Sequence, residues 1–95
     1  MTQAPGIARR LLIIGRVQGV GFRFALADEA RERQLRGWVR NRRDGSVEAI
    51  VAGPAAEVEA MIVWAHRGPP AARVDAVSIE IVEGEFSGFD IVPTA

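Results

Sequence analysis

A glycine-rich run from Gly15 to Arg23 joins an apolar, strand-like segment to a helix-like segment. Its three glycines let the backbone turn tightly and approach a ligand closely. Such a turn points successive amide N–H groups inward, and the following helix adds its unpaired N–H groups and positive dipole end. Arg23 contributes a cation whose planar fork fits phosphate oxygens. The run therefore predicts a pocket for one phosphate-sized anion, although a tight turn with an exposed arginine explains the loop equally well.

Two better-known glycine loops do not fit this run. A nucleotide P-loop ends in Gly-Lys-Ser/Thr, whereas all twelve basic residues of this chain are arginines. A dinucleotide fingerprint has the spacing G-x-G-x-x-G and an acidic residue about 20 positions further on. Here the spacing is G-x-x-x-G-x-G, and Asn41 and Arg42 stand where the acidic residue is needed. Both motifs are therefore excluded.

The rest of the chain alternates strand-like and helix-like patterns without a linker. Residues 1–6 are expected to be a flexible tail, and residues 7–95 one domain. The patterns predict strands over 9–17, 35–42, 46–52, 72–82 and 89–92, and helices over 22–33 and 55–66. Asp44-Gly45 predicts a hairpin turn, Gly53-Pro54 should end the third strand, and Gly68 should end the second helix.

This order, β-α-β-β-α-β with a short strand appended, constrains the fold class. Two helices in so short a chain can cover only one face of a sheet. The order therefore predicts an α+β protein, a two-layer ferredoxin-like sandwich in which an antiparallel sheet carries both helices on one face. Such a fold hosts many functions, so the function must come from the site.

Composition excludes several kinds of site. The chain has no cysteine and one histidine, so disulfides, thiolate chemistry and multi-histidine metal clusters are excluded. No apolar stretch approaches the ~20 residues of a membrane span, and the N-terminus lacks a signal-peptide core, so we expect a cytoplasmic protein that does not bind membranes. Ten of the twelve arginines fall within residues 1–43, which could indicate nucleic acid. Because the chain is neutral overall, we instead expect a local anion field and no nucleic-acid partner.

A second segment, Gly37 to Asn41, lies on the second predicted strand. Side chains alternate along a strand, so Asn41 shares a face with Val39. An amide there can orient a water molecule but cannot deprotonate it. The alternative is an asparagine that satisfies the hairpin loop, and taken alone this residue favours that alternative.

Together the two segments resemble the acylphosphatases. The resemblance includes Gly45, Val47 and Gly53 at their expected spacing and runs from about Arg9 to Ile91. It implies hydrolysis of a small-molecule acyl phosphate to a carboxylate and inorganic phosphate, by a monomer that needs no metal or other cofactor. It also implies that Arg23 binds the phosphate and Asn41 positions the attacking water. The backbone amides that would complete the phosphate cradle are those of Gln18, Gly19, Val20, Gly21, Phe22 and Arg23.

Other readings of the same residues remain open. His66 could act as a base, although a lone histidine near a helix C-terminus usually has a structural explanation. The chain could be a noncatalytic anion-binding module, or an RNA-binding sheet, although no aromatic cluster appears on the first and third strands. Carbamoyl-phosphate-handling proteins of hydrogenase maturation carry a similar domain before cysteine-rich zinc motifs. Since this chain has no cysteine and ends at Ala95, we expect a stand-alone enzyme.

Overall fold

The computed structural model describes residues 6–95, and the predicted order of elements is confirmed. The elements are β1 (Gly6–Arg16), α1 (Phe22–Glu32), β2 (Arg36–Asn41), β3 (Val47–Pro54), α2 (Ala55–Arg67), β4 (Arg73–Val82) and β5 (Phe89–Ile91). Most of the tail expected over residues 1–6 lies outside the described residues. Its last residue, Gly6, is the first residue of β1 and pairs with Pro54.

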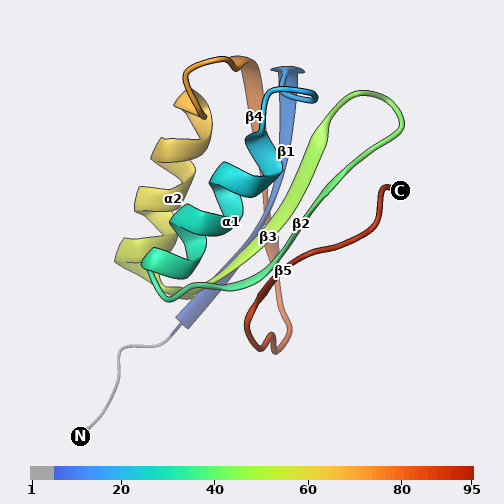
Figure 1. Cartoon of the computed structure of the whole chain (residues 1–95). Helices are drawn as coiled ribbons and strands as arrows, with labels where there is room; N and C mark the ends of the chain where they lie inside the picture. The colour runs from blue at the N-terminus through green and yellow to red at the C-terminus, as the bar shows by residue number, and fades with distance from the viewer. Residues whose placement is uncertain (1–5) are drawn as a thin grey trace, which may run out of the picture.

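The five strands form one sheet in the order β4-β1-β3-β2-β5. The first four strands pair antiparallel, as predicted, whereas β5 pairs parallel with β2, so the sheet is mixed. The chain reverses direction after β4 and reaches the far edge of the sheet (Figure 1). Since β2 also runs opposite to β4, the returning strand is necessarily parallel to β2.

Both helices cover the same face of the sheet (Figure 1), which confirms the two-layer architecture. Alternation along the strands points one set of apolar side chains at the helices. The largest fully buried side chains are Phe22, Leu11, Ile13, Leu26, Met61, Val17, Val39, Val47, Val51 and Val58. Each such side chain stabilises the fold by roughly 1.5–3 kcal/mol through burial. No helix in the described part of the chain is long and apolar enough to cross a membrane.

The third strand runs further than the sequence predicts. Gly53-Pro54 was expected to end it, but Gly53 pairs with Ile7 and the strand continues through Pro54. Gly53 has a φ of 154°, and a Cβ there would lie 2.7 Å from the Leu35 side chain. Glycine at position 53 therefore leaves room for the Leu35 side chain, and β3 continues through this residue instead of ending there. Pro54 is the residue that precedes the first turn of α2.

Candidate active site

The loop between β1 and α1 is shaped by glycines with different tasks. At Gly15 the register between β1 and β4 shifts, and a side chain there would overlap the carbonyl group of Arg73. Gly19 and Gly21 have φ values of 73° and 77°, and nothing lies within 4 Å of a Cβ built on either. The close approach to Arg73 thus requires glycine at position 15, whereas left-handed backbone favours it at positions 19 and 21.

The backbone of this loop presents unpaired donors. The first hydrogen bond of α1 runs from the Ala25 amide to the Gly21 carbonyl oxygen, at 3.0 Å. Within residues 6–95, no backbone carbonyl accepts a hydrogen bond from the amides of residues 18–24. Gly21 precedes the helix and supplies no side-chain cap. The loop and the helix N-terminus therefore offer free N–H groups and a positive dipole end to an anion.

A cavity of about 140 Å³ is lined in part by residues of this loop. Its lining residues are Val17, Gln18, Gly19, Gly21, Phe22, Arg23, Phe24 and Asn41. It brings together the site residues expected from the sequence except Val20, which instead packs against the hydrophobic core. No aspartate, glutamate or histidine lines it, so the charged side chain at this cavity is that of Arg23.

Arg23 is half-buried at the first turn of α1. No carboxylate within residues 6–95 forms an ion pair with it. Its guanidinium carbon lies 5.7 Å from the centre of the Phe24 ring, within the range of a cation–π contact. The guanidinium is therefore available to an anion in the cavity.

Asn41 is the last residue of β2 and lies on the helix-covered face with Val39. Its Oδ1 atom is buried and has no hydrogen-bond partner in the described part of the chain. The hairpin turn is instead satisfied by Asp44, whose Oδ1 accepts hydrogen bonds from the amide and hydroxyl of Ser46 at 2.9 and 2.6 Å. An orphaned amide oxygen beside a polar cavity is suited to accept a hydrogen bond from a water molecule.

The side chain of Gln18 has a role that sequence reasoning missed. Its Nε2 donates to the carbonyl oxygens of Arg42, at 2.7 Å, and Ser46, at 2.9 Å. We expected only the Gln18 backbone to matter. The available signal was a long amide side chain in a loop that otherwise holds glycine and valine. These bonds fix the loop to the β2–β3 hairpin, and thus to the strand end that carries Asn41.

Arg40 and Arg42, which flank Asn41 in the sequence, form ion pairs with Glu48 on the face of the sheet opposite the helices. Glu48 is 3% exposed, and its carboxylate pairs with Arg10, Arg40 and Arg42. Burial alone would raise the pKa of Glu48, but hydrogen bonds from Arg40 and Arg10 outweigh it and hold that pKa below its ordinary value. Arg40 also stacks on Trp38, with 4.7 Å from its guanidinium carbon to the ring centre. Arg40 and Arg42 are therefore engaged with Glu48, unlike Arg23.

His66 lies away from this cavity. It is exposed near the end of α2, and its Nδ1 is 2.9 Å from the Ile62 carbonyl oxygen. A catalytic role for His66 therefore has no geometric support. Among residues 6–95, no group of three or more His, Cys, Asp or Glu side chains is placed to hold a metal ion.

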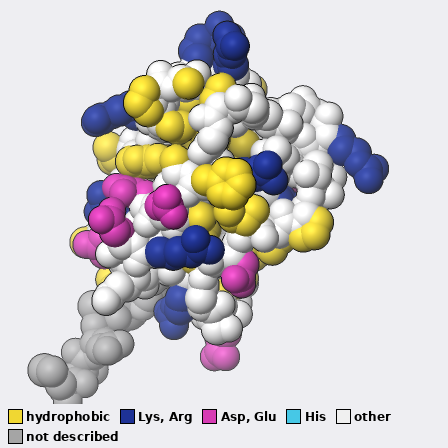
Figure 2. All heavy atoms as spheres, in the orientation of Figure 1, with side chains coloured by type: hydrophobic (Ala, Val, Ile, Leu, Met, Phe, Trp, Pro, Cys, Tyr) yellow, Lys and Arg dark blue, Asp and Glu magenta, His cyan; other side chains and the backbone are white. Residues whose placement is uncertain are grey.

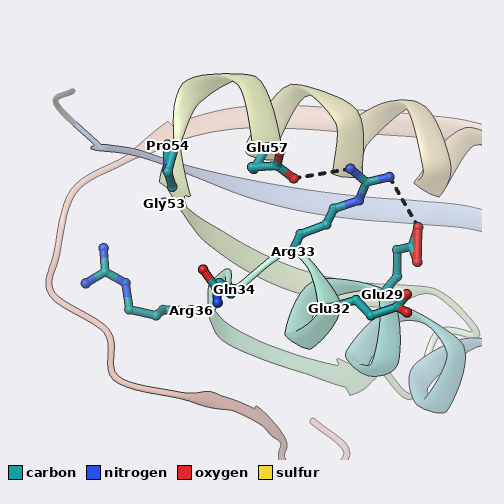
Figure 3. A pocket seen from close by; sticks show the side chains of 8 residues that line it. All are labelled: Glu29, Glu32, Arg33, Gln34, Arg36, Gly53, Pro54 and Glu57. Atoms are coloured by element: carbon teal, nitrogen blue, oxygen red, sulfur yellow. Dashed lines mark hydrogen bonds and ion pairs between the residues drawn. The ribbon is translucent and has the colours of Figure 1, made fainter. Parts of the chain in front are cut away.

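A larger hollow, of about 910 Å³, lies between the end of α1 and the start of α2 (Figure 3). Three carboxylates line it, and Arg33 bridges two of them, with 3.3 Å to Glu29 and 3.2 Å to Glu57. Figure 2 shows acidic side chains gathered over this part of the two helices. These carboxylates would repel an anion such as phosphate. The smaller cavity beside the glycine loop is therefore the better phosphate site despite its size.

Comparisons with known proteins agree with this geometry. The acylphosphatase family model matches residues 9–91. The acylphosphatase of Azoarcus sp. (strain BH72) is 54% identical over 88 residues, covering 92% of this chain and 90% of that protein. The structure of an acylphosphatase from Coxiella burnetii matches with a TM-score of 0.88 and 33% identity, covering 92% of this chain and 93% of that one. Full-length HypF, in a phosphate- and nucleotide-bound form, matches with a TM-score of 0.87 and 33% identity over 95% of this chain but 12% of its own.

Proposed function

Because this chain belongs to the acylphosphatase family, we propose that its glycine loop and Arg23 hold the phosphate of an acyl phosphate while Asn41 holds the attacking water. The activity itself is that of the family, hydrolysis of the carboxyl–phosphate bond to a carboxylate and inorganic phosphate. The observation that carries the residue roles is the shared cavity. Within residues 6–95, the residues around this space of about 140 Å³ include loop residues whose amides have no backbone acceptor, an arginine without an ion pair and an asparagine whose amide oxygen has no hydrogen-bond partner.

The chemistry suits so small a set of groups. An acyl phosphate is a mixed anhydride whose leaving group is a carboxylate, a weak base that departs without protonation. Phosphoryl transfer passes through a loose, in-line transition state, so catalysis consists mainly of positioning and charge stabilisation. The loop amides and Arg23 supply the charge stabilisation. Each charge-assisted hydrogen bond that tightens in the transition state contributes about 1.5–3 kcal/mol.

Asn41 supplies the orientation. Its Oδ1 accepts a hydrogen bond from the water, which places a water lone pair toward phosphorus. The water oxygen bonds to phosphorus as the bond from phosphorus to the acyl oxygen breaks, and the carboxylate leaves with that electron pair. Since no side chain that lines the cavity is a base, the water proton passes to a phosphate oxygen of the substrate.

Every proposed contact comes from one copy of the chain. The cavity is complete with residues of the loop, α1 and β2, which supports a monomeric enzyme. That oligomeric state, the cytoplasmic location and the absence of a nucleic-acid partner stay predictions. The substrate is a small molecule, as the family implies.

Steady-state hydrolysis of acetyl phosphate by the wild type and Arg23→Ala, in the presence of a chelator, tests this proposal. We expect the wild type to turn over, and Arg23→Ala to lose both turnover and inhibition by inorganic phosphate. Arg16→Ala is the control, because Arg16 is an exposed arginine at the end of β1 that does not line the cavity. Normal phosphate inhibition of Arg23→Ala would contradict its role. Loss of wild-type activity in the chelator would overturn the metal-free mechanism.

A further inference from the structure

We propose that Phe24 selects the acyl group of the substrate, favouring acyl phosphates with a large apolar or aromatic acyl group over those with a small one. This inference rests on the proposed function, because it requires the phosphate to occupy the cavity beside Arg23. It adds a substrate preference and assigns it to one residue. Phe24 follows Arg23 in the first turn of α1 and lines the same cavity.

The acyl group must lie outside the phosphate site. The inner wall of the cavity includes Val17 and Phe22, each only 1% exposed, so the core leaves no room on that side. In-line attack places the leaving acyl oxygen opposite the water, and so away from Asn41. The rest of the substrate therefore projects toward the mouth of the cavity.

Phe24 offers the apolar surface at that mouth. Phe24 is 62% exposed, whereas the neighbouring Phe22 is buried in the core. Among the other residues that line this cavity, Gly19 and Gly21 have no side chain, and the amide nitrogen of Gln18 is bonded to the hairpin. An acyl group over this mouth would thus gain contact with an exposed aromatic ring, which removes apolar surface of both partners from water.

The contact between Arg23 and Phe24 adds a second constraint. The guanidinium carbon lies 5.7 Å from the ring centre, so the ring flanks the cation that holds the phosphate. A bound acyl phosphate would therefore meet Arg23 with its anionic end and Phe24 with its acyl end. This arrangement favours a substrate in which a large apolar group directly follows the carboxyl carbon.

The test compares benzoyl phosphate with acetyl phosphate in the wild type, Phe24→Ala and Phe24→Leu. We expect Phe24→Ala to lower kcat/KM for benzoyl phosphate about tenfold and to change that for acetyl phosphate less than about threefold. Inhibition by inorganic phosphate should stay unchanged, and Phe24→Leu should fall between the wild type and Phe24→Ala. Val63→Ala is the control, because Val63 is an apolar side chain, 66% exposed, on α2 and away from the cavity.

Two results would overturn the inference. An equal loss for both substrates in Phe24→Ala would mean that Phe24 only positions Arg23. Wild-type kcat/KM values for both substrates in Phe24→Ala would mean that the ring does not contact the acyl group. Either result leaves wild-type hydrolysis and the effect of Arg23→Ala intact, so failure of this inference is distinguishable from failure of the proposed function. Because Phe24 is largely exposed, Phe24→Ala should fold, and its thermal unfolding should lie within a few degrees of the wild type.

Discussion

The side-chain nitrogen of Gln18 lies 2.7 Å from the carbonyl oxygen of Arg42, so the glycine loop is fastened to the residue that follows Asn41. The two halves of the proposed site come from distant parts of the chain, the loop after β1 and the end of β2. A second bond, from Gln18 to the Ser46 carbonyl oxygen at 2.9 Å, holds the other side of the same hairpin. Gln18 therefore ties the loop proposed to hold the phosphate to the hairpin that follows Asn41.

Gln18→Ala should therefore impair catalysis without removing any group that contacts substrate. Loss of two hydrogen bonds, each contributing about 0.5–1.5 kcal/mol, should lower kcat/KM about 10- to 100-fold if they order the loop. Steady-state kinetics of acyl phosphate hydrolysis measures the loss. Gln34→Asn is the control, because Gln34 is an exposed glutamine that lines the hollow of Figure 3 rather than this cavity. Wild-type kinetics in Gln18→Ala would contradict this role for the side chain.

Gly19→Ala should weaken phosphate binding through the backbone alone. Gly19 has a φ of 73°, and no atom lies within 4 Å of a Cβ built there, so alanine meets strain but no clash. Left-handed backbone costs alanine roughly 1–2 kcal/mol, and relief of that strain would turn the loop amides away from the anion. Gly88→Ala is a matched control, because Gly88 has a φ of 67° in equally open space but lies next to β5.

The two variants are compared by inhibition with inorganic phosphate and by chemical unfolding. Both should lose similar stability, whereas only Gly19→Ala should lose phosphate affinity. Equal phosphate affinity in the two variants would show that the conformation of Gly19 does not shape the cradle.

Glu48 should make stability depend on pH. Its pKa in the folded protein is lowered, so its contribution is complete above the pKa of an unfolded glutamate and is lost as the pH falls through the lowered folded pKa. Glu48→Gln should cost about 1–3 kcal/mol at neutral pH, less than for a fully buried pair because the three arginines are about one-third exposed. Urea unfolding of both proteins from pH 7 to pH 3 should show this difference shrinking with acid. A difference that stays constant down to pH 3 would contradict the ion pairing.

Local patterns explain how much of the fold could be predicted. The period-two strands, the helical periodicity and the glycine and proline positions are all short-range signals, and they yielded every element in order. Gly68, for example, was expected to end α2 and is the residue at its C-terminal cap. The sequence did not reveal the long-range contact that also requires glycine at position 68. The Phe22 ring occupies the space where a Cβ of Gly68 would stand.

Long-range pairing accounts for what the sequence did not reveal. The parallel pairing of β5 with β2 depends on where the chain returns after β4. The ion pairs of Glu48 with Arg10 and Arg40 join residues from three strands. Gln18 illustrates the same limit at the site. Its place in the loop was evident, but its two acceptors lie 24 and 28 residues away in sequence. Motif spacing could indicate which residues form the cavity, but not which side chain holds its halves together.

The kinetics of Asn41→Ala test the proposed roles of Asn41 and Arg23 most directly, with kcat and the inhibition constant of inorganic phosphate measured on the same preparation. We expect kcat to fall at least about 100-fold, because the water loses its orienting partner, while phosphate inhibition changes less than about threefold. The loop amides and Arg23 remain in place in this variant. A normal kcat in Asn41→Ala, or loss of phosphate inhibition together with turnover, would contradict the division of roles between Asn41 and Arg23.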